Sequence, residues 1–314
     1  MIVLTDTSRP WRIDLLAEIY REATSYDIPW IAEDMSGDEM IRQWFDASWF
    51  EPDKFITLYV MGRPAGFAFI WWRNGRIRIN PYIDPRLPRG LFIDVLEIML
   101  SWTRLKGLEK DSYIVQVFAG PEYGILHRAV QEILGVGRSI YSTYIMLAPR
   151  RIRIGGEPVV EIIDYRPGLE EAVASIYNDA FSLYPWFTPI SPADVAKMYR
   201  SGRIRALIAM LDGEPVGYVD FMTRGIGVKA GYIYTLAVKK KYHGMGIGRK
   251  LLAEALRKLR EAGLEIVYLD AYPEVVDYYM RCGFKILRRY INIEYSIEQL
   301  PKTLNYMIVS LGGN

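Results

Sequence analysis

Two segments of the chain, residues 91–108 and 247–264, show the periodic pattern of an amphipathic helix. In the second segment, apolar residues recur every three or four positions and charged residues fill the positions between them. Each segment contains a glycine near its end that suits a left-handed helix terminus, Gly107 in one and Gly263 in the other. The pattern therefore predicts one long helix in each half of the chain, with the two glycines 156 residues apart.

A second pair of segments, residues 55–70 and 206–221, repeats with an offset of 151 residues. In both, two apolar stretches flank a turn that contains glycine and proline, which predicts an antiparallel hairpin. A further strand follows each predicted helix, at residues 113–118 and 266–271, and a short helix and an apolar strand pair come next. The matched turn residues are Gly62 with Gly213, Pro64 with Pro215, and Gly66 with Gly217.

Two copies of one α/β unit explain these repeats, and a chain of 314 residues is long enough for two domains. Basic, glycine and proline residues interrupt the periodic segments between residues 149 and 158. We therefore predict a first domain at residues 1–148, a linker at 149–158, a second domain at 159–297 and a C-terminal tail at 298–314.

The composition narrows the classes of protein to consider. No apolar run reaches the roughly 18 residues of a membrane helix, and the first residues lack the features of a secretory signal, so we expect a cytoplasmic protein without a membrane partner. One cysteine, Cys282, excludes an internal disulfide, and two histidines, His127 and His243, leave little for a metal site. The net charge of +2 predicts no specific nucleic-acid partner, although basic clusters at residues 150–153 and 239–241 leave weak association open.

The strongest chemical motif lies between a predicted strand at residues 231–238 and the second long helix. The connection contains Gly244, Gly246 and Gly248. Without Cβ atoms, such a turn lets backbone N–H groups converge on an anion, and the helix N-terminus adds unpaired donors. The segment therefore predicts a pyrophosphate site. A dinucleotide fingerprint is the alternative, but these glycines lack its G-x-G-x-x-G spacing.

Residues 236–252 resemble the pyrophosphate segment of the GNAT N-acyltransferase superfamily, whose pattern is Arg or Gln, two residues, Gly, one residue, Gly or Ala. His243 takes the Arg or Gln position, which departs from the pattern, although an imidazole still donates to phosphate. A second motif, Tyr279 followed after three residues by Gly283 and Phe284, is similar to the end of the family's signature. Both motifs lie in the second copy.

The resemblance implies an α/β (α+β) protein of two tandem GNAT folds, each a mixed, mostly antiparallel sheet flanked by helices. It also implies acetyl-CoA (coenzyme A) as the cofactor, with its pantetheine amides paired to the exposed edge of the fourth strand. The cofactor-binding residues that it implies are Leu236, Ala237, Val238, His243, Gly244, Met245, Gly246, Ile247, Gly248 and Arg249.

For the chemistry, the resemblance implies that Tyr279 lies beside the thioester sulfur and protonates the leaving thiolate. An aromatic side chain that only packs beside Gly283 and Phe284 is the alternative. Transfer also requires the acceptor amine as a free base, because an ammonium group is a poor nucleophile at neutral pH. A group that accepts a proton is therefore needed as well.

The base is less clear from the sequence. Family members often carry a glutamate on the fourth strand, where this chain has Tyr232 and Tyr234. Asp220 on the preceding strand and Asp270 on the following strand are candidate bases that would act through a water molecule. A purely structural role is the alternative for both carboxyl groups.

The first copy lacks the corresponding chemistry. Proline has no N–H to give to a phosphate, and we expect a phenylalanine side chain to obstruct the approach of a ligand to the backbone. We therefore predict a degenerate first copy, as in tandem-GNAT enzymes of the mycothiol synthase type, and one active site. The matched positions are Leu87 with His243, Pro88 with Gly244, Gly90 with Gly246, Phe92 with Gly248, and Gln131 with Tyr279.

The sequence predicts an acyl-CoA-dependent N-acyltransferase that transfers acetyl by direct attack to a primary amine of a small molecule, a protein N-terminus or a lysine. A non-catalytic acyl-CoA sensor is the alternative, because the glutamate of the fourth strand is missing. Residues 184–189 contain three aromatic residues in the region that the family uses to shape the acceptor pocket. They favour an apolar or flat acceptor, or they only cover the edge of the core.

Overall fold

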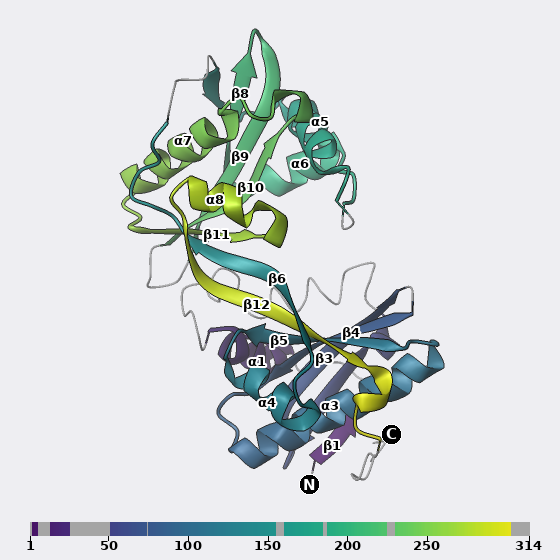
Figure 1. The fold of residues 1–314 in the computed structure, drawn as a ribbon. Helices are drawn as coiled ribbons and strands as arrows, with labels where there is room; N and C mark the ends of the chain where they lie inside the picture. Colours follow the sequence, from purple (N-terminus) through teal and green to yellow (C-terminus); the bar gives the residue numbers. More distant parts are fainter. Residues whose placement is uncertain are drawn as a thin grey trace. The chain divides into compact units, whose positions relative to one another are not determined.

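The computed structural model describes residues 2–5, 13–25, 51–73, 75–154, 160–184, 187–224 and 230–302. The chain forms two compact units, which Figure 1 colours along the sequence. Unit 1 comprises Met1–Thr143 with Arg288–Asn314, and unit 2 comprises Tyr144–Leu287. Among the helices that the structure describes, none has the length and hydropathy needed to span a bilayer.

Unit 2 is built on a mixed sheet with the strand order β6-β11-β10-β9-β8-β7. Neighbouring strands are antiparallel except β10 and β11, which are parallel. The hairpin predicted at residues 206–221 is confirmed as β8 and β9. The strands are β6 (Arg138–Leu147), β7 (Glu161–Asp164), β8 (Ile204–Leu211), β9 (Glu214–Arg224), β10 (Ala230–Val238) and β11 (Ile266–Ala271).

Helices cover both faces of this sheet (Figure 1). Helices α5 (Glu170–Phe181) and α6 (Pro192–Tyr199) pack on the face that carries Tyr218 and Ala237. Helices α7 (Ile247–Glu261) and α8 (Val276–Arg281) pack on the opposite face. The 3-10 helix η2 (Lys240–Tyr242) lies between β10 and α7, and the 3-10 helix η3 (Pro273–Val275) directly precedes α8. The sheet thus holds α5 and α7 on opposite sides of β10.

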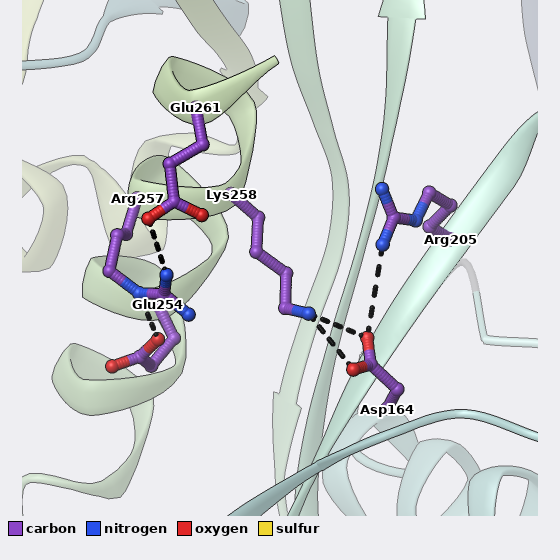
Figure 2. A network of polar contacts seen from close by, with 6 residues as sticks. All are labelled: Asp164, Arg205, Glu254, Arg257, Lys258 and Glu261. Atoms are coloured by element: carbon purple, nitrogen blue, oxygen red, sulfur yellow. Dashed lines mark hydrogen bonds and ion pairs between the residues drawn. The ribbon is translucent and has the colours of Figure 1, made fainter.

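The amphipathic pattern predicted for α7 is confirmed. Its apolar stripe, which includes Leu251 and Leu256, is buried. On its polar face, Arg257 pairs with Glu254 at 2.8 Å and with Glu261 at 2.6 Å, as Figure 2 shows. In the same view, Lys258 reaches Asp164 on β7, a carboxylate that Arg205 on β8 also approaches. These exposed pairs contribute little stability, and the buried stripe holds the helix in place.

Unit 1 repeats the architecture with the strand order β1-β2-β3-β4-β5-β12. Only β4 and β5 are parallel among its described pairs. The second predicted hairpin, at residues 55–70, is confirmed as β2 and β3. Its elements are β1 (Ile2–Thr5), α1 (Ile13–Ser25), η1 (Pro52–Lys54), β2 (Phe55–Val60), β3 (Arg63–Arg73), β4 (Arg76–Ile83), α3 (Arg89–Glu109), β5 (Ile114–Pro121), α4 (Ile125–Leu134), β12 (Lys285–Ser296) and η4 (Ile297–Gln299).

The last strands of the two sequence copies are exchanged between the units. Residues 144–147 of β6, at the end of the first copy, pair with β11 of unit 2. Residues 290–296 of β12, at the end of the second copy, pair with β5 of unit 1. Beyond β12, Ile297 and Leu300 are buried in the core of unit 1. The compact units therefore differ from the predicted segments 1–148 and 159–297, because each segment provides the last strand of the other unit.

Candidate active site

The site begins where β10 and β11 part. The two strands pair from Ala230 with Ile266 to Ile233 with Leu269. Beyond this point β10 has an irregularity between Ile233 and Thr235 and continues to Val238 in pairing with β9 alone among the described strands. Within the described part of the chain, one backbone edge of residues 235–238 therefore has no strand beside it.

The connection from β10 to α7 turns through two glycines in the left-handed region. Gly244 has φ 81°, and Gly246, the N-cap of α7, has φ 76°. No side chain caps the first turn of α7. A helix start of this kind leaves backbone N–H groups available to an anion, and the helix dipole favours negative charge there.

A polar network fixes the start of this loop. Glu214 at the turn of the β8–β9 hairpin accepts hydrogen bonds from Lys239 Nζ at 3.0 Å, Lys241 Nζ at 3.1 Å and Tyr242 Oη at 2.7 Å. These contacts lower the pKa of Glu214 to about 2. Lys239 and Lys241 thus pair with a carboxylate of their own unit. These contacts hold residues 239–242, which lead into the glycine turn, against the β8–β9 hairpin.

Gly248 allows a tyrosine to approach the first turn of α7. A Cβ on Gly248 would lie 2.7 Å from the hydroxyl of Tyr278. That hydroxyl is buried and has no hydrogen-bond partner among the described residues, and burial raises the pKa of Tyr278. A protonated phenol thus lies beside the helix start and Cys282, and it suits a further donor to an anion. The sequence motif gave no sign of this contact, because it depends on how α8 packs.

His243 makes a different contact from the one expected of it. Its Nε2 atom lies 2.8 Å from the carbonyl oxygen of Val238, so this nitrogen donates to the strand rather than toward the helix start. The ring therefore ties the loop to the end of β10. In this arrangement only Nδ1 remains for other partners.

The parting strands, the loop and α8 enclose a cavity of about 930 Å³. All ten residues predicted to bind the cofactor line it, and so does Tyr279. Four of the other lining residues come from segments that the sequence did not mark, because they belong to helices and turns that fold against the loop. They are Ala180, Phe181, Val275 and Tyr278.

Tyr279 has the environment of a protonated phenol. Its side chain is 9% exposed and packs edge-to-face against Tyr278 and Phe284. Burial, with Cys282 and Tyr184 nearby, raises the pKa of Tyr279 well above its ordinary value. Its hydroxyl makes no hydrogen bond to a described residue. The phenol thus faces the cavity with its proton in place at neutral pH.

Asp220 is fully buried and does not line the cavity. Its Oδ2 atom accepts a hydrogen bond of 3.0 Å from Tyr199 Oη, and its Oδ1 atom has no partner in the described part of the chain. Burial raises the pKa of Asp220 to about 7, against the lowering effect of Tyr199 and of Thr235, its cross-strand neighbour. Asp270 is exposed on β11, opposite Ile145, and lies outside the cavity lining.

The corresponding loop of unit 1 has a proline at the N-cap of α3 and acidic side chains just before it. Arg86 pairs with Asp84 at 2.9 Å and with Glu18 at 2.8 Å, just before the N-cap Pro88 of α3. The expectation that Phe92 obstructs a ligand is wrong in its geometry, because Phe92 is 4% exposed and packs inside the core of unit 1. The amphipathic register of α3 directs this side chain inward.

Comparison with known proteins identifies the class of the domain that carries this site. Residues 171–284 match the Acetyltransferase (GNAT) family, so the chain contains a GNAT acetyltransferase domain. Over 99 residues, 26% of this chain, it is 30% identical to an N-alpha-acetyltransferase of Sulfurisphaera tokodaii. Over 54 residues, 17% of this chain, it is 35% identical to an uncharacterized N-acetyltransferase ycf52-like protein of Prochlorococcus marinus. The matches span only 59% and 30% of these two relatives.

Solved structures extend the likeness of the fold to the whole chain. A GCN5-related N-acetyltransferase from Sphaerobacter thermophilus matches with TM-score 0.61 and 19% identity, covering 94% of this chain and 96% of its own. A tandem GNAT protein from the clavulanic acid biosynthesis pathway matches with TM-score 0.62 and 15% identity, covering 95% and 98%. The predicted GNAT resemblance and the mixed-sheet fold are therefore confirmed, and the tandem arrangement agrees with the second structure. The more specific likeness to mycothiol synthase stays a prediction.

Proposed function

We propose that unit 2 binds acetyl-CoA in this cavity and transfers the acetyl group to a primary amine of a small molecule or a protein. The observation that carries the proposal is the shared cavity: the left-handed glycine loop before α7 and the protonated Tyr279 line the same space. A phosphate-bearing thioester and its leaving sulfur require an anion site and a proton donor in the same cavity.

The residues of the cavity fit coenzyme A. The N-terminal turn of α7, with Tyr278 beside Gly248, offers donors to the pyrophosphate, and Arg249 and Arg281 add positive charge. The free backbone edge at residues 235–238 offers the pairing that pantetheine amides need. His243 would hold this edge in place through Val238, and its second nitrogen would donate to a phosphate only in the imidazolium form, in which both ring nitrogens carry protons.

The reaction requires proton transfer to the leaving sulfur and proton loss from the acceptor amine. Nitrogen attack forms the C–N bond while the C–S bond breaks, and the sulfur takes a proton from Tyr279. The acceptor ammonium loses two protons in all: one passes to a base before attack, and the other replaces the proton that Tyr279 gives. Its raised pKa keeps Tyr279 protonated at neutral pH, so the phenol has a proton to give and does not deprotonate the amine.

Asp220 is the proposed destination of the first proton, reached through intervening hydroxyls or water. Its pKa of about 7 lets the carboxylate accept a proton near neutral pH. The matched position of unit 1, at the hairpin offset, is the apolar Phe69, buried at 3% exposure. The fold therefore does not need a carboxyl group there. Asp270 stays a second candidate, because it follows the point where β10 and β11 part.

A non-catalytic acyl-CoA sensor is the competing function, and one observation favours it: neither carboxyl group lines the cavity. Release of free thiol from acetyl-CoA with a panel of primary amines separates the two. Turnover supports the transferase. Coenzyme A binding without turnover of any amine, small or peptidic, would leave the sensor.

A further inference from the structure

Aromatic side chains gather at the end of the cavity that holds Tyr279. The ring centroids of Tyr177 and Phe181 on α5 are 4.8 Å apart, and those of Phe181 and Tyr184 are 5.9 Å apart. Phe187 adds a ring 6.2 Å from Tyr177. Because Phe181 and Tyr184 also line the cavity, this set of rings is continuous with the space beside Tyr279.

Two more tyrosines approach this set from the sheet. Tyr234 lies at the irregularity where β10 leaves β11, and Tyr272 directly follows the end of β11. They are 51% and 44% exposed. Burial raises the pKa of Tyr177, and Tyr234 and Tyr272 add smaller contributions in the same direction. Tyr234 lies on β10 two residues before Leu236, which lines the cavity, and α5 packs on the sheet beside β10.

The cavity lining also carries two arginines. Arg249 and Arg281 belong to the helix start and to the end of α8, where phosphates are expected. No Asp or Glu occurs among the described residues that line the cavity. An acceptor with a second cationic group would therefore find arginines and no carboxylate in the described cavity lining, whereas an apolar body would bury its surface against the rings.

We propose that the acceptor is a small primary amine carried on an aromatic or apolar body, which packs against Phe181 and Tyr184 in the cavity and extends to the exposed ring of Tyr234. This inference rests on the proposed acetyltransferase function and adds the class of its acceptor. Exposed aromatic surface is costly in water, and its concentration at one end of a cavity is typical of a ligand site.

The test compares kcat/KM for 2-phenylethylamine, 1,4-diaminobutane and a short peptide with N-terminal alanine, using acetyl-CoA and the full chain. We expect 2-phenylethylamine to be preferred by at least roughly tenfold, which is the scale of one good ring contact. Tyr234→Ala and Tyr272→Ala should each raise its KM several-fold and leave the Kd of coenzyme A unchanged. Tyr113→Ala, which removes a tyrosine of unit 1 that is 61% exposed, serves as the matched control and should change neither value.

The outcomes distinguish a wrong acceptor class from a wrong acetyltransferase function. Faster acetylation of the diamine or the peptide would overturn the acceptor class while the acetyltransferase function stands. Unchanged KM in both tyrosine variants would also overturn it. Coenzyme A binding without acetylation of any of the three amines would count against the transferase function itself.

Discussion

The loops before α7 and α3 show how one fold keeps or loses an anion site. Before α7, Gly244 and Gly246 adopt positive φ and leave the helix start open to the cavity. Before α3, the chain passes through Pro88, and Arg86 is held by the carboxylates of Asp84 and Glu18. A phosphate approaching α3 would meet negative charge and fewer donors.

The two helices nevertheless pack in the same way. The buried positions of α7 match those of α3 at the offset of 156 residues, for example Leu251 with Val95 and Leu256 with Leu100. Packing and ligand binding therefore depend on different positions of the same helix. This difference explains how a repeat can lose its chemistry and keep its core.

The largest expected effect concerns Tyr279 and its counterpart Gln131. Tyr279→Phe removes the proton donor to the sulfur and should lower kcat/KM by about 10³-fold, with the Kd of coenzyme A unchanged. Gln131→Ala in unit 1 should leave kcat/KM unchanged. Steady-state thiol release measures both variants, and equal turnover by Tyr279→Phe and the unchanged protein would show that Tyr279 is not the proton donor.

The next effect concerns the glycine loop. Gly246→Pro imposes a negative φ where the chain has 76° and removes one N–H group, so the Kd of coenzyme A should rise about 100-fold. Gly90→Pro is its control, because proline is tolerated in the first turn of α3. Calorimetric titration of both variants decides the matter. An equal loss of affinity in both would show that the two loops do not differ as described.

Asp220→Asn should change the pH dependence of both activity and stability. If Asp220 accepts the amine proton, kcat/KM rises with an inflection near its pKa of about 7, and the substitution removes this inflection and lowers the rate at pH 8 about tenfold. Because the folded pKa lies above the unfolded value of 3.8, the carboxyl group stabilises the fold at low pH and loses about 4 kcal/mol of that contribution as the pH rises to 7.

The variant should therefore raise Tm more at pH 8 than at pH 5, which thermal unfolding at the two pH values would check. An unchanged pH–rate profile in this variant would exclude Asp220 as the base and leave Asp270 as the candidate.

The smallest expected effect on binding comes from Phe92→Gly. Because Phe92 is buried in the core, its loss should destabilise unit 1 by roughly 4 kcal/mol and create no second coenzyme A site. Denaturant unfolding and calorimetry together test this expectation. A second site in this variant would show that the side chain alone had blocked it.

Much of this arrangement follows from the sequence, because periodicity and glycine spacing are local properties. The hairpins, the long helices and the loop before α7 lie where the pattern predicts them. The exchange of β6 and β12 could not be predicted, since alternating apolar residues specify a strand and not its partner. The contacts of Tyr278 with Gly248 and of His243 with Val238 likewise arise from tertiary packing.

The residues for proton transfer were harder to place than the cofactor loop. Tyr279 was marked by its spacing to Gly283, and it lines the cavity. Asp220 and Asp270 were chosen by strand position alone, which does not show that one is buried and the other exposed. Trp186, one of the aromatic residues predicted near the acceptor, lies outside the described residues.

The central claim is that the loop before α7 binds coenzyme A and the loop before α3 does not. Calorimetric titration of the full chain with coenzyme A tests it most directly. We predict one site per chain, which Gly246→Pro removes and Gly90→Pro preserves. Two sites per chain, or binding that survives Gly246→Pro and is lost in Gly90→Pro, would contradict the account.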